Sequence, residues 1–276
     1  MTTNEFSKTN AVRRMLEPDS IAVIGASRDE TKRGYQVIES LQEFEYRGNV
    51  YPVNPKYDDE TIRGLRVHES VTDISESVDL AYITVPAQFV PEVIKDCGHK
   101  GVAGAIVVAA GFSEIGNNDL EERMLAVADE YDVRIIGPNV NGIVNVHRGM
   151  DLLADPDIPH GDLALLSQSG NIALGLVYEA LYSGQAGFSF YISVGNEADV
   201  RFHEYLPYLA TNEETSAVTL FVEGMADGAQ FLEEAARFAR KKPIVALKGG
   251  LTDAGKQSAQ SHTASIAGSE SVIDDV

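Results

Sequence analysis

Strand-like and helix-like segments alternate along most of this sequence, and the alternation limits the chain to one broad fold class. Short runs that are apolar on both faces are typical of buried parallel strands, and amphipathic segments between them are typical of helices. Such an order with short connections indicates doubly wound α/β domains. In the first half we predict strands over Ser20–Gly25, Asn49–Val53, Val78–Val85, Gly104–Ala109 and Val133–Gly137, and helices over Tyr35–Tyr46, Gln88–Cys97 and Asp119–Tyr131.

A second α/β unit follows a break at Ala154–Gly161, where two prolines and a glycine are typical of a linker. We therefore predict one domain over residues 1–153 and a second over residues 161–276. A further helix is expected to begin within Ser269–Val276, so we expect the natural protein to continue or to have a partner subunit. In the second unit we predict strands over Leu163–Ser167, Gly187–Val194, Ala217–Glu223 and Pro243–Lys248, and helices over Ile172–Tyr182, Val200–Leu209 and Ala229–Arg240.

The charge of the chain excludes some classes of function. Lys and Arg number 22 against 42 Asp and Glu, which gives a formal net charge of −20, whereas nucleic-acid binding needs a positive surface. The acids are scattered, which favours a solvated surface of the kind that halophiles use over an acidic face for a partner. The single cysteine, Cys97, excludes a disulfide scaffold and a multi-cysteine zinc site, and we predict no metal site.

Neither a membrane span nor a secretory signal is indicated. No apolar run reaches the roughly 18 residues that a membrane helix needs. The first residues, MTTNEFSKTNAVRRML, lack the apolar core and cleavage site of a signal peptide. We therefore expect a cytoplasmic protein with no membrane partner.

The turn after the first predicted strand has the features of a phosphate site. In doubly wound sheets the ligand lies beyond the strand carboxyl ends, where a helix N-terminus favours phosphate. Gly25 permits a tight turn there, whereas the full G-x-G-x-x-G spacing is missing. Potential hydrogen-bond donors follow at Ser27, Arg28, Lys32 and Arg33.

The end of the second strand argues against NAD. NAD sites place an acid there, but this strand ends in Val53-Asn54-Pro55-Lys56. A lysine suits a phosphate on the ribose, as in NADP or in the 3′-phosphate of coenzyme A. The alternatives are a solvated loop lysine at Lys56 and ordinary strand–helix geometry at Gly25.

Three more loops are expected at the same sheet edge. Pro86 ends the third strand and could pack on a flat adenine, and the small residues Ala109–Gly111 would let a ligand approach the backbone. Gly137–Gly142 ends the fifth strand and faces the same crevice. Ordinary turn chemistry is the alternative for all three loops.

A second set of residues points to phosphate chemistry in the second unit. Ser169 and Gly170 open a helix, whose N-terminus can hold phosphate without a cation. Ser193–Asn196 has a similar pattern of small and polar residues after the next strand and could shape the same pocket. His262 lies in a long stretch of small and polar residues that would present an imidazole as a nucleophile, with Glu223 at a strand end to orient it. An ordinary helix cap and a solvated loop histidine are the alternatives. The other five histidines are interpreted as structural.

Together these motifs resemble the α-subunit part of the ADP-forming acyl-CoA (acetyl-CoA) synthetases, relatives of succinyl-CoA synthetase. The resemblance extends from about residue 10 to the end of the chain. Ala264 departs from the family, which usually has glycine after Ser-His-Thr, and no nucleotide-binding ATP-grasp part is present. The matching segments are Val23–Ser27, Tyr51–Lys56, Val85–Ala87, Gly137–Asn139, Ser167–Gly170, Ser261–Thr263 and Ala267–Gly268.

The resemblance implies a Rossmann-like CoA-binding domain followed by a flavodoxin-like ligase domain. It implies an acid–CoA ligase in which phosphate displaces CoA from an acyl-CoA, and His262 takes the phosphoryl group and passes it to ADP. ATP or ADP with Mg²⁺ would bind an ATP-grasp domain or subunit outside this chain, in an oligomer. The implied roles are catalytic for His262 and Glu223, phosphate-binding for Ser169 and Gly170, and CoA-binding for Gly25, Ala26, Ser27, Lys56, Val85, Pro86, Ala109, Ala110 and Gly111.

Two other interpretations of these motifs remain possible. The first is a CoA-binding regulatory module, or one linked to an acetyltransferase, without ligase activity; retention of His262 and Glu223 argues against it. The second is an NADP-dependent oxidoreductase, which would leave the His262 stretch and the Ser169 helix end without a role.

Overall fold

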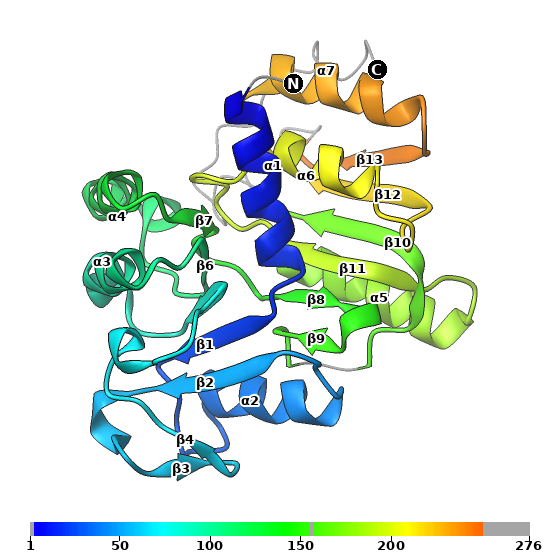
Figure 1. The fold of residues 1–276 in the computed structure, drawn as a ribbon. Coiled ribbons are helices and arrows are strands. Elements are labelled where there is room, and N and C mark those ends of the chain that lie inside the picture. The colour runs from blue at the N-terminus through cyan, green and yellow to red at the C-terminus, as the bar shows by residue number, and fades with distance from the viewer. Residues whose placement is uncertain (1–2, 155–156, 251–276) are drawn as a thin grey trace.

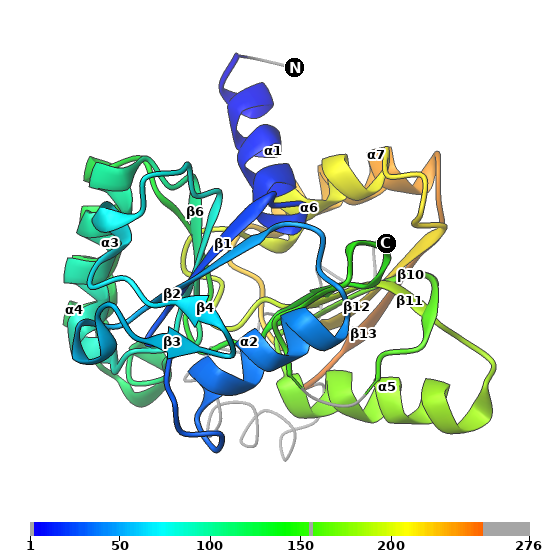
Figure 2. The same cartoon turned by 60° about the horizontal axis from the view of Figure 1, so that its bottom comes forward.

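Two mainly parallel sheets with helices against their faces make up the molecule (Figures 1 and 2), which confirms the predicted α/β class. The computed structural model describes residues 3–154 and 157–250. Within these ranges no helix has both the length and the apolar character needed to cross a membrane.

The first sheet is entirely parallel and has the strand order β2-β1-β5-β6-β7. All five strands predicted in the first half are present, and helices α2, α3 and α4 lie between them in the chain. A two-stranded hairpin, β3–β4, follows β2. The bounds are β1 Ser20–Ile24, α2 Arg33–Glu43, β2 Asn49–Val53, β3 Thr61–Ile62, β4 Leu65–Arg66, β5 Leu80–Ile83, α3 Val90–Lys100, β6 Gly104–Val107, α4 Asn118–Glu130 and β7 Arg134–Ile136.

The second sheet has the order β13-β12-β10-β11-β8-β9. Strands β10 to β13 are parallel to one another, whereas β8 pairs antiparallel with β11 and β9 antiparallel with β8. The four strands and three helices predicted for this unit are all present. The bounds are β8 Ile143–Asn145, β9 Met150–Asp151, β10 His160–Ser167, α5 Gly170–Ser183, β11 Phe188–Ser193, α6 Phe202–Leu209, β12 Ala217–Val222, α7 Gly228–Ala239 and β13 Ile244–Lys248.

The structure differs from the sequence prediction around the linker. Strands β8 and β9 precede the predicted boundary at residue 153, yet they extend the second sheet, so by sheet membership the second unit begins at Ile143. Strand β10 already begins at His160, inside the predicted linker. Gly161, the second residue of β10, lies so close to Gly187 that an added Cβ would stand 2.4 Å from the Gly187 carbonyl carbon, which explains the glycine at this position.

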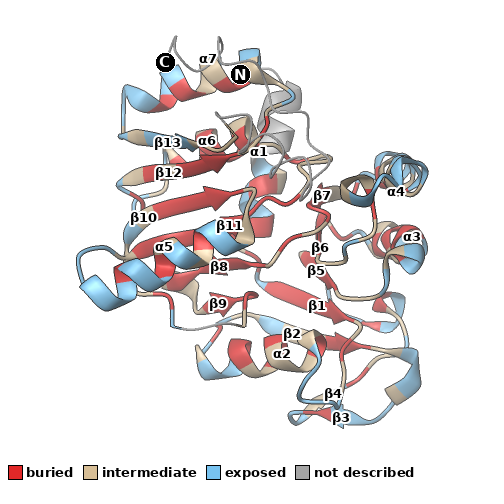
Figure 3. Ribbon diagram, turned by 180° about the vertical axis from the view of Figure 1, so that it is seen from behind, coloured by how far each residue is buried: buried red, intermediate tan, exposed pale blue. Residues whose placement is uncertain are grey.

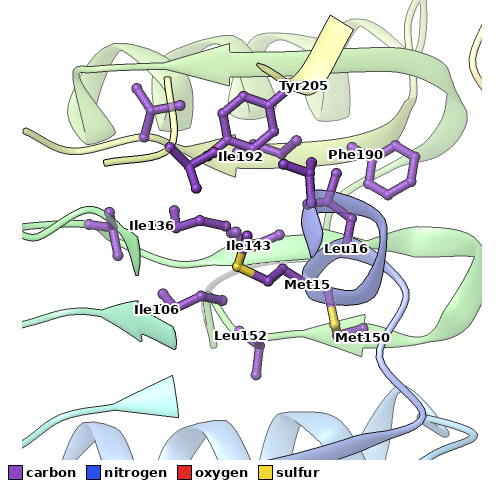
Figure 4. Packing of buried hydrophobic residues seen from close by; sticks show 14 of the residues in the cluster. Met15, Leu16, Ile106, Ile136, Ile143, Met150, Leu152, Phe190, Ile192 and Tyr205 are labelled. Atoms are coloured by element: carbon purple, nitrogen blue, oxygen red, sulfur yellow. The ribbon is translucent and has the colours of Figure 1, made fainter. Parts of the chain in front are cut away.

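Helix α1 (Thr3–Leu16), which the sequence reading did not predict, joins the two sheets. It contacts β6 of the first sheet and α6 of the second unit. Met15 and Leu16 are fully buried in a single hydrophobic cluster that also contains Ile106 from β6 and Phe190 from β11 (Figure 4). Burial is concentrated on the strands and the inner faces of the helices (Figure 3). Because one core spans both sheets, the loops between them are held in place.

Candidate functional site

Each sheet contains one topological switch point. Strand β1 pairs with both β2 and β5, so the chain winds first to one side of β1 and then to the other. Strand β10 has the same relation to β11 and β12. Ligands of open α/β sheets bind beyond the carboxyl ends of the strands at this position. The Gly25 turn follows β1 and the Ser167–Gly170 segment follows β10, so both predicted motifs lie at a switch point.

A pocket of about 350 Å³ lies at the first switch point. Three of the predicted CoA-site residues, Gly25, Val85 and Pro86, line it, and Lys56 follows directly after the lining residue Pro55. Pro86 is exposed, and Phe89 is 53% exposed, so the pocket wall offers apolar surface to a ligand. The remaining lining residues are Ile24, Val53, Asn54, Glu69, Ser70, Val71, Val93 and Asp96.

The turn at Gly25 has no room for a side chain. Its φ is +93°, and an added Cβ would stand 2.5 Å from Thr84 Oγ1. The N–H groups of Gly25 and Ala26 donate to the Val53 carbonyl at 3.0 and 3.2 Å, so these two donors are used inside the protein. Ala26 is fully buried. Gly25 and Ala26 therefore shape the turn, and their amides are not available to hold phosphate.

The cations predicted near this turn have different surroundings. Arg28 pairs with Glu60 at 2.5 Å. Arg33 lies partly buried and donates to the Tyr82 hydroxyl at 3.2 Å and to the Asn141 carbonyl. Lys56 is exposed, with Nζ 5.2 Å from the centroid of the Tyr57 ring. Arg28 is exposed as well, but it is paired with Glu60, whereas the exposed Lys56 follows directly after Pro55 in the pocket wall.

The remaining polar residue of this turn, Ser27, is engaged locally. Its hydroxyl accepts a hydrogen bond from the Asp29 amide at 3.0 Å. Ser27 is half-buried, so it contributes to the loop conformation at the edge of the site.

Asn54 organises the site, although sequence reasoning gave it no role. Its Nδ2 donates to the Ala26 carbonyl at 2.7 Å, and its Oδ1 accepts from the Lys56 amide at 3.0 Å. One side chain thus ties the loop after β1 to the loop after β2. The sequence signal was its position before Pro55, where an asparagine can cap a short helix.

The loop after β6 lies at the same sheet edge as the pocket. Gly111 has φ +118°, and a Cβ there would meet the Ala87 side chain at 3.2 Å. Ala109 is half-buried and accepts a backbone hydrogen bond from Asn139, whereas Ala110 is exposed. These predicted residues therefore border the site near Ala87 and do not line the 350 Å³ pocket itself.

The second switch point is built around the N-terminus of α5. Ser169 is the N-cap, and its hydroxyl accepts from the Ile172 amide at 3.5 Å. No acidic residue lies in the first turn, so the positive end of the helix dipole is uncompensated there. A Cβ on Gly170 would stand 2.0 Å from Asn141 Nδ2, because a loop of the first unit packs against this helix end. The predicted pair Ser169 and Gly170 thus forms an anion-compatible helix end.

Gln168 connects this helix end to Glu223, and sequence reasoning assigned it no role. Its Oε1 accepts from the backbone N–H groups of Glu223 and Gly224 at 2.5 and 3.0 Å. Its Nε2 donates to the Gly224 carbonyl at 2.8 Å. Lys248 Nζ donates to the Glu223 carbonyl at 2.6 Å, and burial lowers the pKa of that lysine against the opposing effect of the Glu223 charge. The position of Glu223 at the carboxyl end of β12 is therefore fixed from two sides.

The loop Gly137–Gly142 connects the two switch points. At one end, Asn139 donates from its backbone to the Ala109 carbonyl at 3.1 Å. At the other end, the Asn141 amide donates to Ser193 Oγ at 3.1 Å, and Gly195 approaches Pro138 so closely that a Cβ would lie 2.1 Å from its carbonyl oxygen. Both loops that the sequence assigned to the crevice, Gly137–Gly142 and Ser193–Asn196, therefore lie between the sites.

His262 lies outside the described residues, so its predicted role stays a prediction. Within residues 3–154 and 157–250, no group of three or more His, Cys, Asp and Glu side chains is placed to hold a metal ion.

Two family models match consecutive parts of the chain. A model of the CoA binding domain matches residues 19–145, and a model of the succinyl-CoA ligase like flavodoxin domain matches residues 160–276. The chain is 42% identical to the ADP-forming acetate–CoA ligase of Methanocaldococcus jannaschii over 93% of its own length and 36% of the relative. It is also 42% identical to the α subunit of ADP-forming acetate–CoA ligase II of Pyrococcus furiosus, over 92% of this chain and 55% of that subunit.

A solved structure agrees with these relatives. The dinucleotide-forming acetyl-coenzyme A synthetase 1 of Candidatus Korarchaeum cryptofilum, in complex with phosphate and ADP, superposes with a TM-score of 0.90 at 37% identity. The alignment covers 96% of this chain and 57% of that one. The chain therefore spans between about a third and somewhat more than half of the length of these relatives. The chain thus carries a CoA-binding domain followed by a succinyl-CoA ligase-like flavodoxin domain, and over most of its length it is similar to ADP-forming acetate–CoA ligases.

Proposed function

We propose that this chain supplies the CoA site and the phosphoryl-carrying histidine of an ADP-forming acid–CoA ligase. The observation that carries the proposal is the pair of switch-point sites joined by the loop Gly137–Gly142. One site has the features of a nucleotide-like ligand pocket and the other has an anion-compatible helix end. A ligase that uses phosphate to cleave a thioester and then phosphorylates a histidine needs a CoA pocket and a phosphate site close to each other.

The first site suits coenzyme A. The exposed ring of Pro86 and the side chain of Phe89 offer flat apolar surface for the adenine. The Lys56 ammonium is positioned at the end of β2, where it would pair with the 3′-phosphate of CoA. Gly25 lets the chain turn closely beneath the ligand, and Ala109–Gly111 would border its pantetheine arm.

The second site suits a phosphoryl group on His262. A phosphate oxygen would attack the thioester carbonyl carbon, and cleavage of the C–S bond would release CoA and leave an acyl phosphate. The His262 imidazole would then attack phosphorus, and cleavage of the P–O bond would release the acid. The Ser169 hydroxyl and the Gly170 amide at the N-terminus of α5 would hold the phosphoryl oxygens, and the Glu223 carboxylate would orient the imidazole. The β-phosphate of ADP would finally take the phosphoryl group.

The nucleotide step would use a further part of the enzyme. We propose that ADP with Mg²⁺ binds an ATP-grasp domain or subunit outside these 276 residues. The relatives named above are acetate–CoA ligases, so acetyl-CoA is the first acyl-CoA to test.

The test is a coupled assay with the nucleotide-binding part present. We expect acetyl-CoA, phosphate and ADP to yield ATP and CoA, and we expect ³²P-phosphate to label the chain at His262 when acetyl-CoA is added. CoA binding without labelling and without ATP formation would instead support a CoA-binding regulatory module.

The acidic surface leads to a related proposal about salt. We propose that the net charge of −20 adapts the chain to high salt, because added ions screen the repulsion among surface carboxylates. We expect the melting temperature and ligase activity to rise from about 0.1 M to above 1 M KCl. Equal stability and activity at both salt concentrations would contradict this interpretation.

A further inference from the structure

Glu197 is a half-buried carboxylate that the function described above does not use. Its Oε2 accepts from Gln168 Nε2 at 2.6 Å, and its Oε1 accepts from the Phe202 amide at 2.8 Å. The backbone of Glu197 has a φ of +52°, a value that residues other than glycine rarely adopt. Such a backbone persists only where the surroundings hold it in place, and it is common near functional sites.

The Glu197 carboxylate completes the set of partners around Gln168. The amide of Gln168 uses its oxygen for the backbone N–H groups of Glu223 and Gly224, and its nitrogen for the Gly224 carbonyl and for Glu197. Because both Glu197 oxygens face N–H donors, only a carboxylate satisfies both donors without placing a hydrogen against one of them. We call these contacts the Gln168 clamp.

The neighbouring residue connects the clamp to the other site. Asn196 Nδ2 donates to Glu114 at 2.7 Å and to Glu121 at 3.1 Å. Glu114 in turn accepts from the amides of Gly111 and Phe112, at the start of the loop after β6. Burial alone would raise the pKa of the Glu114 carboxyl, but these hydrogen bonds hold it below its usual value. The Asn196–Glu114 contact thus joins two loops of different sheets.

We propose that Glu197 is a positioning residue for phosphoryl transfer, which holds Gln168 against the backbone of Glu223, and that Asn196 ties this clamp to the CoA loop. The inference rests on the proposed function, since it gives Glu223 the task of orienting the phosphorylated imidazole. Movement of the loop at Gly111 when CoA binds would be transmitted to Glu223 through two sets of hydrogen bonds, which the peptide link between Asn196 and Glu197 connects. The clamp would therefore act in both half-reactions, and the Asn196 link only in the one that uses CoA.

The protonation of Glu197 provides a readout that a purely structural role would not give. Burial raises its pKa to about 7, and the charge of Asp227 acts in the same direction. Arg201 and the hydrogen bonds from Phe202 and Gln168 oppose this rise. Tyr205, from α6, also interacts with Glu197. Because the carboxylate form makes the clamp, the phosphorylation rate should rise with pH through about 7.

The first experiment uses Glu197→Gln in the enzyme with its nucleotide-binding part, and Asp151→Asn as the matched control. Asp151 is also a buried carboxylate with a pKa raised by burial, and it accepts bonds from Ser40 and the Leu153 amide, remote from Gln168. We expect Glu197→Gln to slow phosphorylation of His262 about tenfold in both half-reactions, a barrier change of about 1.4 kcal/mol, and to reduce the rise with pH to the part that deprotonation of the attacking imidazole gives. Asp151→Asn should change stability but keep the rate and its pH dependence.

The second experiment tests the link to the CoA loop with Asn196→Ala. We expect phosphorylation from ATP to keep its rate and phosphorylation from acetyl-CoA and phosphate to fall severalfold. An equal loss in both directions would show that Asn196 has only a structural role in the clamp.

Two different failures can be told apart. If the unaltered enzyme is not phosphorylated from either side, the proposed function is wrong. If it is phosphorylated at His262 and Glu197→Gln matches it in rate and pH profile, the ligase assignment stands and the positioning role of Glu197 is refuted.

Discussion

The two sheets have the same strand order at their centres and yet hold different chemistry at their switch points. In the first sheet β1 lies between β2 and β5, and β6 follows β5; among the parallel strands of the second sheet β10 lies between β11 and β12, and β13 follows β12. The first site offers exposed groups, Lys56 and Phe89, beside an open pocket. The second is a network of partly buried amides and carboxylates around Gln168. Topology therefore fixes where a ligand can bind, and the residue types there decide what happens to it.

This difference has an energetic consequence. Exposed charges contribute little each, about 1 kcal/mol or less, so the first site should tolerate single substitutions with moderate losses of affinity. Removing the partner of a buried polar group destabilises the protein by the full desolvation penalty of the group that is left without a hydrogen bond. The second site should therefore respond more sharply to changes of one atom than the first.

The largest expected effect is at His262, the proposed nucleophile. We expect His262→Ala to abolish phosphoryl transfer, because the proposed transfer to ADP passes through this imidazole, while CoA binding to the first site stays unchanged. Labelling with ³²P-phosphate measures the first quantity and calorimetric titration with CoA the second. Stable label in this variant would overturn the assignment of His262, and loss of CoA binding would show that the two sites are not separable.

The next effect in size is at Glu223, the residue that we propose orients the imidazole. Glu223→Gln keeps the shape of the side chain and removes its charge, so we expect phosphorylation to slow by about ten- to a hundredfold, as is typical of lost acid–base or electrostatic assistance. The melting temperature should change little. Glu213→Gln, an exposed carboxylate of the same unit, is the matched control. An unchanged rate in Glu223→Gln would remove its role.

A smaller effect is expected at the turn of the first site. Gly25→Ala would add a Cβ 2.5 Å from Thr84 Oγ1 at a φ of +93°. The matched control is Gly64→Ala, because Gly64 has a φ of +81° but no atom within 4 Å of its added Cβ. Both variants carry the backbone strain, roughly 1–2 kcal/mol, and only the first carries the clash. We expect CoA affinity to fall about tenfold in Gly25→Ala alone. Equal affinities would show that this turn does not shape the pocket.

The sequence predicted the two parallel sheets because strand and helix periodicity are local properties of the chain. It also placed Gly25, Val85, Ser169 and Glu223 at strand or helix ends, where the topology brings them to the ligand edges. Strands β8 and β9 were missed because three or two residues carry no readable period. Their place in the second sheet depends on pairing with β11, which is distant in sequence.

The roles of Asn54, Gln168 and Glu197 could not be read from the sequence for a similar reason. Each acts by hydrogen bonds to backbone groups of another loop, so its role depends on how the strands are ordered in space. Arg28 and Arg33 show the reverse case. Their spacing after Gly25 suggested phosphate donors, but Arg28 pairs with Glu60 and Arg33 reaches Tyr82. A cation near a ligand site is informative only once its own partners are known.

The smallest expected effect comes from the exposed lysine of the first site. We expect Lys56→Gln to weaken CoA binding about fivefold, which corresponds to about 1 kcal/mol for an exposed charge pair. Binding of dephospho-CoA should not change, because it lacks the 3′-phosphate that Lys56 would contact. Lys241→Gln, an exposed lysine in the second unit, removes the same charge at a distance and corrects for the general repulsion between the ligand and a chain of net charge −20.

Calorimetric titrations at about 0.15 M salt, where the screening length is near 8 Å, separate these contributions. If Lys56→Gln weakens both ligands equally, its effect is a long-range one and the 3′-phosphate lies elsewhere. If the unaltered chain prefers NADPH to CoA, the pocket serves a different nucleotide and the first site does not have the role that the second one requires. If Lys56→Gln weakens the binding of CoA but not of dephospho-CoA, the 3′-phosphate end of CoA lies at the end of β2. The thioester end of an acyl-CoA would then point toward the loop Gly137–Gly142, which leads to the second site.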